Sequence, residues 1–104
     1  MAATRTRLPD RRAIETFTFA CNNLNYTASI SRFENGNLAE IFITNNKAGS
    51  HSDAAAKDSA VVCSIALQYG VPVNVIKHAL LRDARGTESS PLGVALDLLD
   101  ELPF

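Results

Sequence analysis

Two asparagine-containing pairs divide residues 16–44 into three runs, and this division constrains the fold more than any other feature of the sequence. Asn22-Asn23 separates the first run from the second, and Asn35-Gly36 separates the second from the third. Asn-Gly favours the type I′ turn of a two-residue hairpin, whose central residues both have positive φ. The pattern predicts a three-stranded antiparallel meander, with positive φ at both Asn35 and Gly36.

Two-residue hairpins also fix the register of the strands. Cys21 is expected opposite Leu24, Arg32 opposite Ala39, and Ile30 opposite Ile41. Because directly paired residues share a face of the sheet, one face then collects the apolar residues Phe17, Phe19, Cys21, Leu24, Tyr26, Ala28, Ile30, Ala39, Ile41 and Ile43. The other face is mostly threonine, serine, asparagine and glutamate. Two turns chosen on local chemistry thus agree on a single buried face.

Three apolar side chains fall on the polar face of this predicted sheet. Phe33 is expected opposite Leu38, and Phe42 lies on the same side. We interpret the three as a candidate interaction surface, and an ordinary exposed cluster is the alternative interpretation.

Cap and stop residues after the sheet predict helices. Their expected bounds are Ser50 or Ser52 to about Tyr69, Pro72 to about Ala84, and Ser90-Pro91 to about Leu102. The first is apolar on most sides, which is typical of a helix buried on more than one side. The sequence therefore predicts a two-layer α+β domain, in which two to three helices pack on one face of the meander.

The length fits one small domain, and the net charge gives no general attraction to nucleic acid. The chain has 104 residues and a formal net charge of -1, so it lacks a global positive field. We expect a basic, flexible arm over residues 1–12 and a single domain over residues 13–104. No apolar run approaches the roughly 20 residues of a membrane span. With only two cysteines, Cys21 and Cys63, the chain is expected to be cytoplasmic with reduced thiols.

Residue patterns that carry chemistry are weak. The two cysteines lack the paired spacing of a zinc site or of a redox motif, so we expect no metal and no cofactor. Ser50-His51-Ser52-Asp53 has the residue types of a catalytic triad, but neighbours in a capping loop do not make one. Lys47, Gly49 and Ser50 form a candidate anion site at a helix N-terminus, as any capped helix does.

The first two predicted helices and the turn between them resemble a helix-turn-helix, because a small residue, a glycine and an apolar residue recur at the spacing of that motif. Asn74, Lys77 and Arg82 would then be the nucleic-acid contacts. A DNA reader places polar residues at the start of its second helix, where this chain has Pro72 and Val73. The spacing is therefore more typical of two helices joined tightly over a sheet.

Three segments carry a family resemblance: Glu40-Ile41-Phe42-Ile43, Lys47-Ala48-Gly49-Ser50 and Ser64–Pro72, which reads SIALQYGVP. Together they resemble the TSCPD-type domain of adenosylcobalamin-dependent (class II) ribonucleotide reductases, over about Ile14 to Leu102. The chain departs from the motif that names the family. In Glu88-Ser89-Ser90-Pro91-Leu92, serine stands at the cysteine position and leucine at the aspartate position.

The resemblance implies kinship with a reductase module rather than nucleotide reduction by this chain. We expect an accessory domain without catalytic activity of its own, which contacts a protein partner: a ribonucleotide reductase subunit or a second copy of the chain. Two alternatives stay open, a small nucleic-acid-binding regulator and an inhibitor-like interaction protein from a mobile element.

Overall fold

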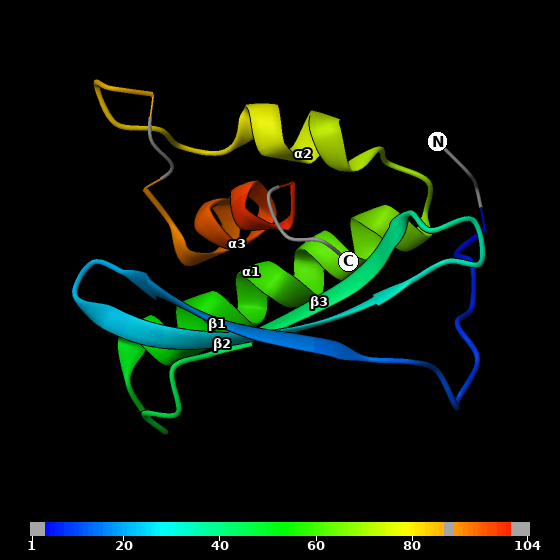
Figure 1. Ribbon diagram of the computed structural model, residues 1–104, viewed down its shortest axis with the longest axis horizontal. Coiled ribbons are helices and arrows are strands. Elements are labelled where there is room, and N and C mark those ends of the chain that lie inside the picture. The colour runs from blue at the N-terminus through cyan, green and yellow to red at the C-terminus, as the bar shows by residue number, and fades with distance from the viewer. Residues whose placement is uncertain (1–3, 87–88, 101–104) are drawn as a thin grey trace.

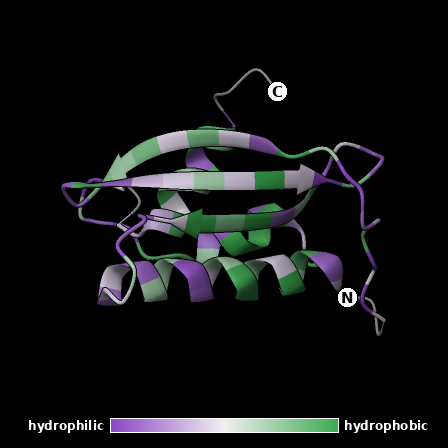
Figure 2. Cartoon of the chain, turned by 90° about the horizontal axis from the view of Figure 1, so that it is seen from below, coloured by the Kyte–Doolittle hydropathy of each residue, from purple (hydrophilic) through white to green (hydrophobic). Residues whose placement is uncertain are grey.

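A computed structural model describes residues 4–86 and 89–100. Its elements are β1 (Glu15–Cys21), β2 (Leu24–Arg32), β3 (Leu38–Thr44), α1 (His51–Gln68), α2 (Val73–Ala79) and α3 (Pro91–Leu99). The strands form one antiparallel sheet in the order β1-β2-β3. The helices lie on one side of this sheet (Figure 1), and Figure 2 looks onto the other side, where no helix lies in front of the strands. The predicted α+β meander is confirmed.

The first hairpin has the predicted geometry. Asn22 and Asn23 have φ of 52° and 65°, which the type I′ turn requires of its two central residues. Asparagine tolerates this left-handed region better than other residues with a Cβ. Cys21 pairs with Leu24, as predicted, and the same register continues along both strands.

The second hairpin differs from the prediction. Gly36 has φ of 89°, whereas Asn35 does not have a positive φ. The N–H of Phe33 donates to the Asn37 carbonyl at 2.8 Å, and the N–H of Gly36 donates to the Phe33 carbonyl at 2.9 Å. This is a three-residue loop with a left-handed glycine at its end. The Asn35 side chain stabilises it by accepting from the N–H of Asn37 at 2.9 Å.

A β-bulge compensates for the longer loop. Arg32 pairs with Leu38, and Ser31 pairs with Glu40, so Ala39 is an extra residue in β3. From Ile30 and Ile41 onward the register is the predicted one. The bulge turns Leu38 into the core, where it is 7% exposed. The predicted pairings of Arg32 with Ala39 and of Phe33 with Leu38 are therefore wrong.

The core lies between the inner face of the sheet and two helices. Helix α1 contributes Ala56, Ala60, Cys63 and Leu67, which recur at the spacing of one helical face, and α3 contributes Leu92, Ala95 and Leu96. The alanines let α1 approach β3 closely. Helix α1 is buried on one side only, since Val61, Val62 and Ile65 on its other side are exposed. Our expectation of burial on more than one side is wrong for this chain.

Helix α2 is shorter than predicted. Helix α2 ends at Ala79, because Leu80 has an extended backbone with ψ of 154°. Helix α3 begins as predicted: Ser90 is its cap, and the Ser90 hydroxyl accepts from the N–H of Gly93 at 3.2 Å. Leu102, which the prediction included in this helix, lies outside the described residues. Among the described helices, none is both long enough and apolar enough to cross a membrane.

Candidate functional site

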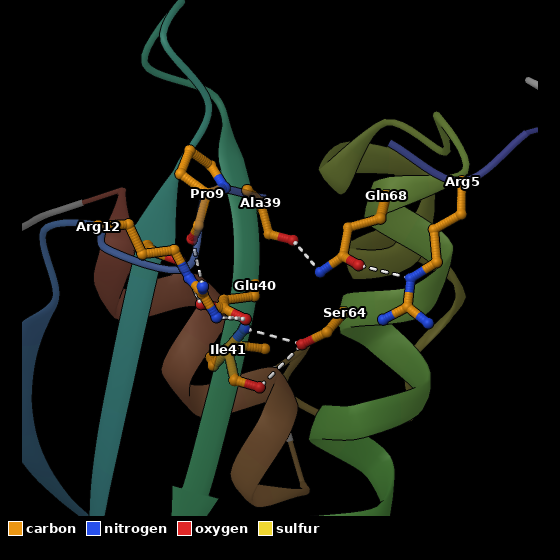
Figure 3. A network of polar contacts seen from close by, with 9 residues as sticks. Arg5, Pro9, Arg12, Ala39, Glu40, Ile41, Ser64 and Gln68 are labelled. Atoms are coloured by element: carbon orange, nitrogen blue, oxygen red, sulfur yellow. Dashed lines mark hydrogen bonds and ion pairs between the residues drawn. The ribbon is translucent and has the colours of Figure 1, made fainter. Parts of the chain in front are cut away.

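Polar side chains of α1 cover the edge of β3 that faces away from β2. The Ser64 hydroxyl accepts from the N–H of Ile41 and donates to the carbonyl of Ile41, both at 2.9 Å. One helical turn later, the Gln68 amide donates to the Ala39 carbonyl at 3.2 Å. An uncovered strand edge is a template for pairing with another chain. Helix α1 closes this edge by means of side chains (Figure 3).

A second group of contacts attaches the N-terminal arm to β3. Arg12 Nε lies 2.5 Å from Glu40 Oε1, and the same carboxylate oxygen accepts from the Ser31 hydroxyl at 2.6 Å. The Arg12 guanidinium also donates to the Pro9 carbonyl at 2.6 Å. Glu40 belongs to the polar face of the sheet, as predicted, yet it is only 4% exposed. The Arg12 guanidinium donates a hydrogen bond to each of the two carboxylate oxygens of Glu40.

The arm has another attachment at the end of α1. Arg5 Nε donates to the Gln68 side chain at 2.6 Å, and the N–H of Thr6 donates to the Gln68 carbonyl at 2.8 Å. Gln68 therefore joins the arm to β3, because its amide nitrogen reaches Ala39 (Figure 3). Residues 4–12 are fixed to the domain at both of these points.

The Arg12–Glu40 pair is electrostatically stable. Burial acts to raise the pKa of Glu40, but hydrogen bonds from Arg12 and Ser31 and the charge of Arg12 outweigh it, so the pKa lies below its ordinary value. The hydrogen bond to Glu40 raises the pKa of Arg12. Glu40 is ionised at neutral pH and keeps its charge-assisted contact with the arm.

We predict that Glu40→Gln loosens the arm. The amide keeps the shape of the side chain but loses the charge that holds Arg12. Trypsin should then cleave after Arg11 and Arg12 several-fold faster than in the wild type, as measured by mass spectrometry of the released fragments. Glu34→Gln, in the exposed hairpin loop, is the control. Equal cleavage of Glu40→Gln and the control would contradict this attachment.

The attached arm forms one wall of a hollow of about 1060 Å³, which we call the arm groove. Its other walls are the β2–β3 loop and the loop between α1 and α2. The lining residues are Thr6–Pro9, Arg11, Arg12, Arg32–Asn35, Asn37, Leu38, Leu67 and Gly70–Asn74. The sequence offered no signal for this groove, because its walls come from three segments that are distant along the chain.

By the outer sheet face we mean the side seen in Figure 2. From the strand register, its side chains are Thr16, Thr18, Ala20, Asn25, Thr27, Ser29, Ser31, Glu40, Phe42 and Thr44, most of which are polar. Thr16, Ser29 and Phe42 form one row across the three strands. Phe42 is 48% exposed on this row. Leu38 is in the core, and Phe33 is half-buried at the rim of the arm groove. The three residues of the predicted interaction surface therefore do not form one patch, and Phe42 is the one that the outer face presents.

The candidate anion site lies at the start of α1. Gly49 has φ of 80°, and the Ser50 hydroxyl caps the helix by accepting from the N–H of Asp53 at 3.2 Å. The N–H of Ser50 donates to the Lys47 carbonyl at 3.0 Å, and Lys47 is exposed. His51 is exposed at the first helical position. These contacts account for the loop as a helix cap.

Asp53, in the first turn of α1, is buried and has several polar partners. Its carboxylate accepts from the Thr44 hydroxyl at 2.7 Å and the N–H of Asn45 at 2.9 Å, and it lies 2.9 Å from Lys57. Hydrogen bonds from Lys57, Thr44 and Asn45 lower the pKa of Asp53 to about 2. Asp53 thus ties the start of α1 to the end of β3.

The alternative nucleic-acid residues are mostly engaged with α3. Lys77 is paired with Asp100 and lies 3.6 Å from Asp97, and the contact with Asp100 raises the pKa of Lys77. Arg82 lies 3.5 Å from Asp97. Asn74 is exposed and belongs to the lining of the arm groove. The positive charges of Lys77 and Arg82 are therefore paired with acids of the same domain.

Cysteine and metal chemistry have little support within the described residues. Cys21 and Cys63 are buried and unbridged, and burial raises the pKa of Cys21 and raises that of Cys63 to about 11. A high pKa suppresses the reactive thiolate. Residues 4–86 and 89–100 contain no group of three or more His, Cys, Asp or Glu side chains placed to hold a metal ion.

Comparison with known proteins identifies the family of this domain. Residues 4–100 match the TSCPD domain family. The chain is 30% identical over 100 residues to a vitamin B12-dependent ribonucleotide reductase of Rhodopirellula baltica. The matched region covers 92% of this chain and 10% of that protein. No solved structure matched. The chain belongs to the TSCPD domain family, and it spans about a tenth of the length of the curated relative that it matches.

The segment that gives the family its name is structural in this chain. Ser90, at the position of the motif cysteine, is the cap of α3. Leu92, at the position of the motif aspartate, is buried in the core. A thiol or carboxylate function is absent from both positions, because neither side chain carries the group. Glu88, the first residue of the segment, lies outside the described residues.

Proposed function

We propose that this chain is an accessory domain without catalytic activity of its own, which docks on a protein through its outer sheet face. The observation that carries the proposal is Phe42, a large apolar side chain that is half exposed on a sheet face with no helix in front of it. Aromatic residues at the centre of a protein contact supply much of its binding energy. The neighbouring Thr16 and Ser29 give the polar surroundings of such a contact.

Family membership supports a reductase subunit as the partner, with a second copy of the chain as the other possibility. The Rhodopirellula baltica relative is a vitamin B12-dependent ribonucleotide reductase, of which this region is a small part. A domain of this size that belongs to a larger protein contacts the remainder through part of its surface. The same surface would serve docking by a separate chain.

Phe42→Asp tests the proposal. We expect it to weaken association at least tenfold, because the change places a charge in a desolvated contact. Light scattering after size exclusion measures self-association, and calorimetry measures binding to a purified vitamin B12-dependent ribonucleotide reductase. Val62→Asp, which places the same charge on an exposed apolar residue of α1, is the matched control, and circular dichroism checks the fold of both variants.

Two results would count against this function. One is a wild-type chain that stays monomeric at high concentration and binds no reductase. The other is reduction of a ribonucleotide by the purified chain unaided, which would show that the domain has an active site of its own.

A further inference from the structure

The arm groove presents positive charge that the domain does not neutralise. Arg11 is exposed and has no hydrogen bond or ion pair with any other described residue. Arg7 has an ion pair with Asp10 at 3.8 Å, and both side chains are exposed. Such exposed pairs contribute little and exchange partners readily. Glu34 is the one acid among the described lining residues. The groove is therefore a local positive surface on a chain of net charge -1.

The floor of the same groove is apolar. Leu38 and Leu67 form part of the lining and belong to the hydrophobic core, and Val71 and Val73 continue the lining between α1 and α2. Phe33 is half-buried at the rim. A small inorganic anion would use the arginines but leave this floor unused. A ligand that fits both features combines negative groups with apolar side chains.

We propose that the arm groove binds an extended acidic peptide segment of a partner protein, with aliphatic or aromatic side chains between its acids. Arginine forks match carboxylates in a bidentate geometry, and the apolar floor accepts the side chains between them. Asn35, Asn37 and Asn74 on the rim offer amides to a peptide backbone. The inference rests on the proposed role in protein contacts but uses a different surface from that of Phe42.

The groove also requires the contacts that hold the arm. Arg12 is bound to Glu40, and Arg5 is bound to Gln68, so these two arginines position the wall. Arg7 and Arg11 lie on the same segment and are left to meet the ligand. This division explains why one short arm carries four arginines.

Fluorescence anisotropy with a labelled synthetic peptide of alternating glutamate and leucine, ending in phenylalanine, tests the inference on the full chain. We expect saturable binding that weakens with added salt. The double variant Arg7→Gln, Arg11→Gln should bind roughly five-fold more weakly, since it removes two exposed charge contacts. Phe33→Ala should also weaken binding, because it removes an apolar contact. Arg85→Gln, an exposed arginine outside the groove, should leave affinity unchanged.

Three outcomes would overturn the inference. They are no binding of the peptide, an equal affinity for the same peptide with glutamine in place of glutamate, and an equal loss in the Arg85→Gln control. A single-stranded oligonucleotide that binds more tightly through Arg7 and Arg11 would assign the groove to nucleic acid instead. Phe42→Asp should not change peptide binding. The proposal for the outer sheet face and the proposal for the groove can therefore be rejected independently.

Discussion

Ser64→Ala should destabilise the domain by about 2 kcal/mol, because it leaves the buried N–H and carbonyl of Ile41 without their partner. A loss of this size lowers the melting temperature of a domain of about 100 residues by roughly 10 °C. Ser64 is buried, so water cannot replace its hydroxyl. Urea unfolding followed by circular dichroism measures the effect.

Ser59→Ala is the matched control for this prediction. Ser59 is on the same helix and half-buried, and its hydroxyl donates only to the Ala56 carbonyl one turn earlier. Both substitutions bring the same gain in helix propensity, so their difference isolates the contact with β3. We expect Ser59→Ala to change the free energy of unfolding by less than about 0.5 kcal/mol. If the two variants lose equal stability, α1 does not depend on Ser64 to close the edge of β3.

Asp53→Asn is expected to destabilise the domain at neutral pH and to have little effect near pH 2. The Asp53 carboxylate holds Thr44, Asn45 and Lys57 together, and its charge strengthens each of these contacts. Its pKa falls from the ordinary 3.8 to about 2 in the folded protein. The stability that this shift contributes is present above pH 3.8 and is lost as the pH falls through 2.

Thermal unfolding of wild type and Asp53→Asn from pH 7 to pH 2 checks this expectation. The wild type should lose melting temperature between about pH 4 and pH 2 more steeply than the variant does. Glu40 contributes in the same direction in both proteins, because its pKa is lowered too. Asp58→Asn, on the exposed side of the same helix, should follow the wild type. A gap between wild type and Asp53→Asn that stays constant over this range would contradict the assignment.

The polar network shows which part of a site can be predicted without coordinates. Ser64 and Gln68 are one helical turn apart and lie near the buried stripe of Ala60, Cys63 and Leu67. Polar residues on a buried stripe must have partners, so their spacing could have indicated a contact with the sheet. The partners themselves could not be found this way. Ile41 and Ala39 offer backbone groups, which no sequence pattern marks.

The second hairpin shows where local rules reach their limit. The pair Asn35-Gly36 correctly predicted a turn, and Gly36 has the positive φ that this pair predicts for it. The number of loop residues was decided elsewhere, because the bulge at Ala39 restores the register that places Ile41 and Ile43 in the core. A two-residue turn would bury Ile41 and Ile43 equally well, so the burial of Leu38 is what favours the longer loop with its bulge. The same bulge moved Leu38 from the expected surface into the core.

Residue order by itself determined the class of fold, the first hairpin and the caps of α1 and α3, because each depends on interactions between residues close in sequence. It also carried the family resemblance, which rests on the segments around Glu40 and Ser64. Only the tertiary structure decided that Arg5 and Arg12 hold the arm against α1 and β3. Their partners are 63 and 28 residues away along the chain. Such contacts depend on how the layers pack, and so the arm groove exists only in the folded chain.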